Sequence, residues 1–81
     1  VDACDLEFGL STPNVEESQV NQAMARIAKE KILVADSSKF GKRSLSRIIP
    51  LSEVDVIITD RALPQAIQNE LRARELRLML V

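Results

Sequence analysis

The sequence predicts an α/β fold with a mostly parallel sheet and flanking helices. Aliphatic runs at residues 32–35 and 54–58 have the composition of strands buried on both faces. Segments with helical spacing of apolar residues precede the first run and follow the second, and a last aliphatic run lies at residues 76–81. Helices that alternate with aliphatic strands are typical of a parallel sheet with right-handed crossovers.

The length and composition indicate one small domain. The chain has 81 residues, enough for a single modest core, and 46% of them are apolar. Only Phe8 and Phe40 are aromatic, so we expect an aliphatic core. The polar-edged stretch that follows Val1 has the character of a strand that is ending, which favours a piece of a longer protein whose upstream part is missing.

Charge and residue usage exclude several classes of function. Eleven basic and twelve acidic residues give a net charge of −1, whereas nucleic-acid binding normally requires a basic excess. One cysteine and no histidine exclude an internal disulfide, and we expect neither a metal site nor a cofactor. No apolar run could span a bilayer and no signal peptide is visible, so we expect a cytoplasmic protein.

The first helix is predicted over residues 14–30. Thr12-Pro13 supplies a capping hydroxyl and a proline whose missing N–H is harmless there, and Glu16 and Glu17 suit the first turn. Apolar residues then recur at helical spacing, which predicts a stripe that packs onto the sheet: Val20, Ala23, Met24, Ile27 and Ala28.

Residues 31–36 follow as a strand that we expect to be covered on both faces. Residues 37–53 have no helical period and predict a long ordered loop, with a short extended piece at residues 47–49.

The second half repeats the alternation. Residues 54–59 form the next predicted strand, and Pro64 starts a second helix with Ile67 and Leu71 on its inner face. Residues 76–81 close the chain as a final strand.

Polar residues follow both central strands. Asp36-Ser37-Ser38-Lys39 comes after the first and Thr59-Asp60 after the second. Asp2 and Asp5 form a further group with Gly9, and Ser11-Thr12-Pro13-Asn14 leads into the start of the first helix. Carboxyl ends of parallel strands share one sheet edge, so these groups can converge there. Carboxylates suit sugar hydroxyls, whereas hydroxyls and an ammonium suit a phosphate. The sequence therefore predicts a site for a small phosphorylated molecule, although Asp and Ser after strands are also ordinary turn residues.

Four segments together carry a resemblance. They are GLSTPNVEE at residues 9–17, Ala23-Met24, ADSSKFG at residues 35–41 and VDVIITD at residues 54–60. In this combination, over residues 1–63, the chain resembles the C-terminal effector domain of DeoR-family bacterial transcription regulators. The family usually has a glycine in the early acidic turn, where this sequence has Ala3.

The resemblance implies a domain similar to sugar-phosphate isomerases such as ribose-5-phosphate isomerase. Such a domain senses a phosphorylated sugar and controls an upstream helix-turn-helix domain that binds DNA. Residues 1–81 would be the C-terminal portion of the effector domain, with its upstream strands and the helix-turn-helix domain lying outside them. Regulators of this type commonly act as oligomers, so we expect a homo-oligomer.

The same resemblance assigns roles to individual residues. Asp2 and Asp5 would orient the sugar, Asn14 and Glu17 would line the pocket, Ser37, Ser38 and Lys39 would lie near the phosphate, Asp36 would hold the strand-end turn, and Phe40 and Gly41 would shape the loop. No residue is expected to be catalytic.

Three functions remain open on the sequence. A sensor domain of a repressor of carbohydrate metabolism is favoured, because no general base stands out. An isomerase-type enzyme would use a carboxylate to remove a proton next to a carbonyl. A receiver domain would accept phosphate on Asp36 or Asp60, but receiver strands are separated by helices, and residues 37–53 predict none.

Overall fold

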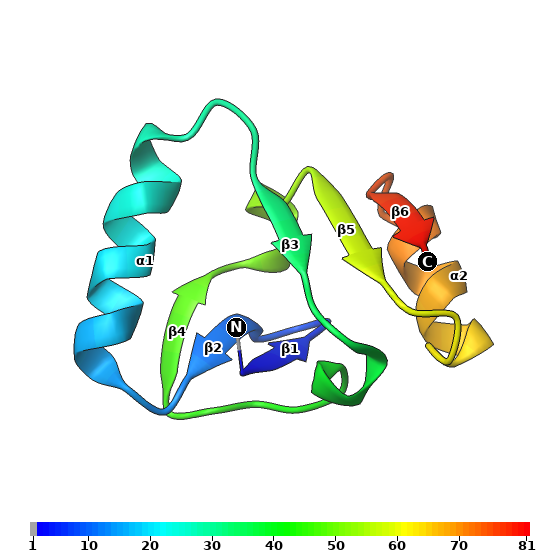
Figure 1. The fold of residues 1–81 in the computed structure, drawn as a ribbon, viewed down its shortest axis with the longest axis horizontal. Coiled ribbons are helices and arrows are strands. Elements are labelled where there is room, and N and C mark those ends of the chain that lie inside the picture. The colour runs from blue at the N-terminus through cyan, green and yellow to red at the C-terminus, as the bar shows by residue number, and fades with distance from the viewer. Residues whose placement is uncertain (1) are drawn as a thin grey trace.

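Two three-stranded sheets share one aliphatic core in the computed structural model, which describes residues 2–81 (Figure 1). The elements in chain order are β1 (Ala3–Asp5), β2 (Gly9–Thr12), α1 (Val15–Ile27), β3 (Ile32–Val34), the short 3-10 helix η1 (Ser37–Lys39), β4 (Ser46–Ile49), the 3-10 helix η2 (Leu51–Glu53), β5 (Val56–Thr59), α2 (Gln65–Ala73) and β6 (Arg77–Leu80).

The first sheet is antiparallel and has the strand order β1-β2-β4. β1 and β2 form a hairpin, and Gly9 starts its second strand with a φ of +93°. A Cβ atom at Gly9 would lie against the carbonyl oxygen of Ile49 and 2.8 Å from Pro50 Cα. Glycine is therefore what allows β2 to pass this close to the end of β4.

The second sheet is parallel, in the order β3-β5-β6. Its central strand buries Ile57 completely, and Leu71 of α2 is equally buried in the same cluster. Ile67 packs against that cluster as a half-buried side chain, so the predicted inner face of the second helix is confirmed. α2 thus covers the core face of the parallel sheet.

A guanidinium links the two halves of the fold. Arg74, just after α2, donates through Nη1 to the carbonyl oxygen of Leu6 in the β1–β2 turn at 2.7 Å, and its Nε lies 3.1 Å from the Glu70 carboxylate. The turn of the antiparallel sheet is therefore held directly by the helix that packs on the parallel one.

The expected single, mostly parallel sheet is not what the described residues form. The chain is an α/β domain, but only β3, β5 and β6 are parallel, and the other three strands form a separate antiparallel sheet. The aliphatic runs mark the parallel strands by composition. The hairpin strands have three and four residues, and β2 pairs with a strand more than thirty residues away along the chain, so no local pattern reveals them.

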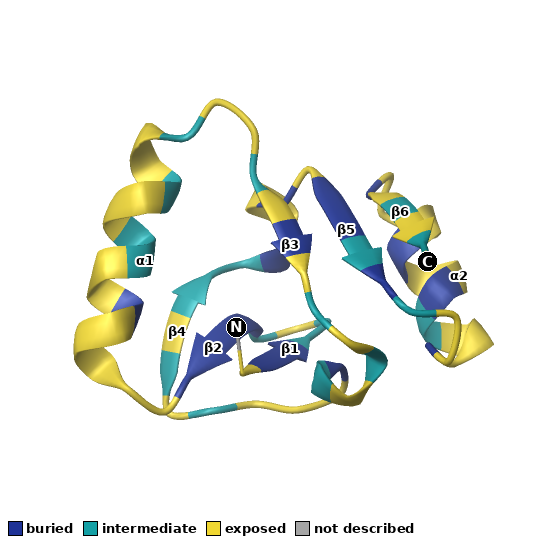
Figure 2. Cartoon of the chain, in the orientation of Figure 1, coloured by how far each residue is buried: buried dark blue, intermediate teal, exposed yellow. Residues whose placement is uncertain are grey.

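The predicted packing of the first helix is also wrong. α1 buries Ser18, whereas Val20, Met24 and Ile27 of the expected inward stripe are exposed (Figure 2). The helix packs through small polar groups: Ser18 Oγ and Ser46 Oγ of β4 lie 2.7 Å apart. Its N-cap is Asn14, whose Oδ1 accepts the Glu17 N–H at 2.9 Å, while the predicted cap Thr12 ends β2.

The strand at residues 32–34 is present but is not covered on both faces. Leu33 is buried in the core, while Ile32 and Val34 are exposed on the opposite face. The predicted loop contains β4 and two short 3-10 helices but no α-helix among its described residues 37–53. No helix within residues 2–81 is long and apolar enough to cross a membrane.

Candidate functional site

The turn after β3 meets the end of β5, as expected for neighbouring parallel strands. The Ser37 N–H donates to Asp60 Oδ2 at 2.8 Å, and Asp60 Oδ1 accepts the Ala62 N–H at 2.9 Å. Asp36 Oδ1 accepts the Ser38 N–H at 2.9 Å and also the Ser38 hydroxyl. Asp36 therefore holds the strand-end turn, and Asp60 fastens that turn to the next strand.

These contacts lower the pKa values of both carboxyl groups. The pKa of Asp36 is lowered chiefly by the Ser38 hydroxyl and then by the Ser38 N–H. The pKa of Asp60 is lowered chiefly by the Ser37 N–H. Lys39, whose side chain is half-buried at the end of η1, lies close enough to Asp36 to lower the pKa of that carboxyl further.

Most backbone donors of the turn are already used. The Ser37 and Ser38 N–H groups bond to carboxylates, the Lys39 N–H donates to the Asp36 carbonyl at 3.2 Å, and the Phe40 N–H donates to the Ser37 carbonyl at 3.3 Å. An anion at this place would therefore bind to side chains, above all to the Lys39 ammonium, and not to a cradle of free N–H groups.

The same segment runs alongside β1. Phe40 and Cys4 form a parallel bridge, and the Gly41 N–H donates to the Cys4 carbonyl at 2.8 Å. In this register Lys39 lies beside Ala3, next to Asp2 along the chain. Phe40 is buried in the core and acts as an anchor, while Gly41 has a φ of +78° and turns the chain away.

Asp2 is tied to the start of α1. Its Oδ2 accepts the Thr12 hydroxyl at 2.8 Å, and Thr12 Oγ1 in turn accepts the Asn14 N–H at 3.4 Å. Asn14 uses its amide oxygen to cap the helix, and Glu17 is exposed in the first turn. Asp2, Thr12 and Asn14 thus form one group, and only the register of β1 relates it to Lys39.

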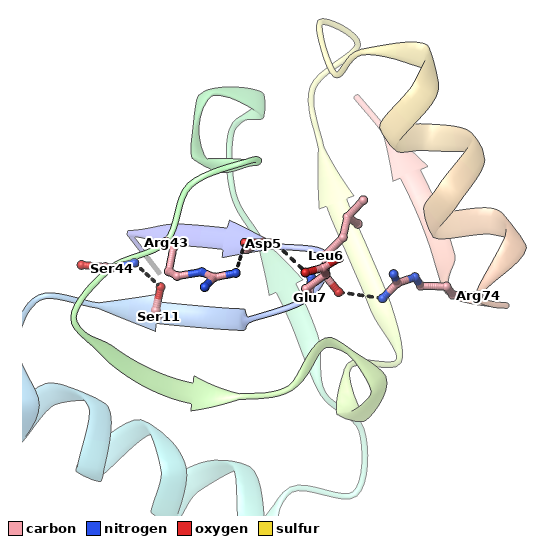
Figure 3. A network of polar contacts seen from close by, with 7 residues as sticks. All are labelled: Asp5, Leu6, Glu7, Ser11, Arg43, Ser44 and Arg74. Atoms are coloured by element: carbon pink, nitrogen blue, oxygen red, sulfur yellow. Dashed lines mark hydrogen bonds and ion pairs between the residues drawn. The ribbon is translucent and has the colours of Figure 1, made fainter.

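Asp5 belongs to a different set of contacts (Figure 3). Its carboxylate lies 3.1 Å from Arg43 Nη2 and accepts the Glu7 N–H at 3.0 Å. The Glu7 N–H is the main cause of its lowered pKa, and Arg43 adds to it. Arg43 also stacks over Phe8, with 4.8 Å between Cζ and the ring centroid. The partnership of Asp5 with Arg43 was missed on the sequence, because the two residues are far apart along it.

Two hollows of the fold lie away from these residues. One of about 530 Å³ sits at the amino edge of the parallel sheet beside Asp55 and Arg74, and one of about 430 Å³ lies between α1 and β3. None of the predicted site residues lines either hollow.

One further group at the strand ends was not singled out as a site residue. Thr59, the last residue of β5, is 3% exposed, and its hydroxyl has no hydrogen-bond partner among the described residues. The ITD ending of the second aliphatic run is the sequence signal that marks Thr59 together with Asp60.

Comparison with known sequences points to one family. The family described as the DeoR C-terminal sensor domain matches residues 1–61. An Escherichia coli O157:H7 protein assigned as a transcriptional repressor of the aga operon is 42% identical over the whole chain. The HTH-type transcriptional regulator GlpR of Haloferax volcanii is 39% identical over 88% of the chain, and the HTH-type transcriptional repressor GlcR of Bacillus subtilis is 38% identical over 74% of it.

The chain is much shorter than these relatives. It spans 30% of the length of the E. coli protein, 28% of GlpR and 23% of GlcR.

Proposed function

Because this chain belongs to the family of DeoR C-terminal sensor domains, we propose that it binds a phosphorylated sugar and thereby controls a transcriptional repressor of carbohydrate metabolism. DNA would be bound by a helix-turn-helix domain elsewhere in the longer protein. The near-neutral charge of residues 1–81 supports this division of labour, since the segment lacks the basic excess that DNA binding requires.

The observation that carries the proposal is the turn at the ends of β3 and β5. Asp60 fastens the Asp36–Lys39 turn to the neighbouring strand by the 2.8 Å bond to the Ser37 N–H, which fixes where Lys39 leaves the sheet. The Lys39 ammonium beside the Asp36 carboxylate suits a ligand with both a phosphate and hydroxyl groups. The Asp2–Thr12 pair at the start of α1 would supply further oxygen atoms to such a ligand.

We extend the proposal to the whole sensor domain. The parallel sheet β3-β5-β6 would be the part of a ribose-5-phosphate-isomerase-like fold that these residues contribute. The relatives are named as regulators or repressors, which supports a sensor and not an isomerase. We place the full protein in the cytoplasm, as an oligomer.

The test uses the full-length protein and a panel of pentose and hexose phosphates in a thermal-shift assay. One phosphorylated sugar should raise the melting temperature, because a ligand that binds only the folded state stabilises it by mass action. Lys39→Ala should weaken binding of that sugar phosphate by about 1.5–3 kcal/mol, the range for a hydrogen bond to a charged group. Lys42→Ala, at an exposed position three residues further along the chain, is the matched control and should bind normally.

The regulatory half of the proposal is tested by operator release. The ligand should dissociate the wild-type protein from its operator in a gel-shift assay, while the Lys39→Ala variant should stay bound at the same ligand concentration. Equal ligand affinities of the Lys39→Ala and Lys42→Ala variants would show that Lys39 does not contact the ligand. Turnover of the sugar phosphate would instead support an enzyme.

A further inference from the structure

A hollow of about 530 Å³ lies at the amino edge of the parallel sheet, where β5 and β6 begin. Three buried side chains give it an apolar floor: Leu51, Val54 and Leu76. Four exposed polar residues form its rim: Ser52, Asp55, Arg74 and Glu75. We call this hollow the amino-edge pocket. The Asp36–Lys39 turn lies at the carboxyl edge of the same sheet, so the two places do not overlap.

Within residues 2–81, the two carboxylates of the rim have no cationic partner. Neither Asp55 nor Glu75 takes part in an ion pair there. Arg74, the cation among the lining residues, is already engaged, because it donates to the Leu6 carbonyl and to the Glu70 carboxylate. The amino-edge pocket therefore combines an excess of negative charge at its rim with an apolar floor.

This combination suits a side chain with an aliphatic stem and a cationic end. Lys and Arg have this form, since their methylene groups cover apolar surface while the charged group stays near water or a carboxylate. In the amino-edge pocket such a stem would lie against Leu51 and Val54. Its charged group would lie between Asp55 and Glu75, and the pocket thus fits a basic surface better than a neutral or acidic one.

We propose that the helix-turn-helix domain of the longer protein docks on the amino-edge pocket through a Lys or Arg side chain when it is not bound to DNA. The inference rests on the proposed function, which supplies that domain. A DNA-binding domain has a basic surface, because much of its affinity comes from Lys and Arg contacts to phosphates. A domain on the same chain is also present at a high effective concentration, which favours it over a separate basic protein.

Docking and DNA binding exclude each other in this arrangement, because both use the cations of the helix-turn-helix domain. The docked form therefore lowers the apparent affinity for DNA in proportion to its population. Since the Asp36–Lys39 turn is at the other edge of the sheet, a sugar phosphate bound there does not block the amino-edge pocket. The docked form is thus the DNA-free state of the repressor.

Thiol labelling of the full-length protein tests whether the amino-edge pocket is covered. Ser52→Cys places a thiol of similar size at the rim, and Leu45→Cys is the control at a loop position that is 76% exposed. Without DNA, a maleimide should label Ser52→Cys at least about tenfold more slowly than Leu45→Cys, because access requires the docked domain to open. A mixed-sequence DNA duplex at low salt should make the two rates similar, because it takes over the basic surface. Native Cys4 is buried and gives little background.

Substitution of Glu75 tests the charge of the rim. Glu75 follows α2 with a φ of +64°, where glycine is the usual residue, so Glu75→Gly removes the carboxylate and should not lower the melting temperature. Added to Ser52→Cys, it should make labelling fast without DNA. On its own it should tighten binding to the mixed-sequence duplex several-fold. Glu16→Gln, which removes an exposed carboxylate of α1 outside the pocket, should change neither result.

Several results would overturn the proposal. Equal labelling of Ser52→Cys and Leu45→Cys without DNA would show that the amino-edge pocket is open. Slow labelling that DNA leaves unchanged would show that another part of the protein covers it, and slow labelling that becomes fast on dilution alone would show that a second copy does. Failure of sugar-phosphate sensing is distinguishable from these results: it appears as a missing thermal shift in the wild type, whereas the labelling rates decide the docking without any sugar phosphate.

Discussion

At the residue scale, two glycines share the left-handed backbone conformation but differ in the space around them. Gly9 and Gly41 both have positive φ, at +93° and +78°. A Cβ atom at Gly9 would meet the backbone of β4 and Pro50, whereas one at Gly41 would have no atom within 4 Å. The first position is constrained by both conformation and space, the second by conformation alone.

Replacement of each glycine by alanine should therefore have unequal effects. Gly41→Ala should lower the free energy of unfolding by about 1–2 kcal/mol, the usual strain of a left-handed residue with a Cβ. Gly9→Ala should lower the free energy of unfolding by clearly more than Gly41→Ala does, because the end of β4 must also move to make room for the Cβ atom. Urea denaturation of both variants measures the difference, and equal losses would contradict the close approach of β2 to Ile49.

At the scale of elements, the turn between β3 and η1 is stabilised by ionised carboxylates. The pKa of Asp60 is lowered in the folded protein, mainly by the Ser37 N–H. Such a group stabilises the fold above its unfolded pKa of about 3.9, and this contribution is lost as the pH falls through the lower folded value. The turn should thus loosen in acid.

Substitution of Asp60 by asparagine tests this dependence. Both carboxylate oxygens of Asp60 accept a backbone N–H, and asparagine retains only one acceptor oxygen, so Asp60→Asn should be less stable at neutral pH. Its melting temperature should also fall less steeply than that of the wild type below pH 4 or so. If the melting temperatures of the two proteins fell equally as the pH is lowered, the carboxylate charge would not be what holds the turn.

Sequence reasoning succeeded for elements that local patterns define. The aliphatic runs located β3 and β5, and the rule that parallel strands end at one edge brought Asp36 and Asp60 together. It failed for α1, because periodicity reveals an apolar stripe without saying what lies against it. Here the Ser18 hydroxyl of the helix meets the Ser46 hydroxyl of β4. The contact of Asp5 with Arg43 joins segments that no local pattern relates.

At the scale of the whole molecule, one core serves both sheets. Cys4 and Leu10 of the antiparallel sheet pack in the same cluster as Ile57 and Leu71. Because these residues share one core, we expect the two sheets to unfold together. Burial in this core also raises the pKa of the Cys4 thiol to about 11, which makes it a poor nucleophile at neutral pH.

A core truncation should reveal this coupling. Leu71→Ala removes a fully buried side chain and should lower the free energy of unfolding by about 2–5 kcal/mol. Leu45→Ala, at a 76% exposed position, should change it by no more than about 0.5 kcal/mol. Probes in each sheet should report one transition in both variants, and two separate transitions would contradict the shared core.

The bond from Arg74 to the Leu6 carbonyl has a mechanical consequence. The 2.7 Å bond from Arg74 Nη1 to the Leu6 oxygen attaches the hairpin to the end of α2, on the side of the parallel sheet opposite the Asp36 turn. A tilt of α2 would therefore pull on the hairpin and, through β1, on the segment that carries Lys39. Movement of α2 would in this way be transmitted to the segment that carries Lys39.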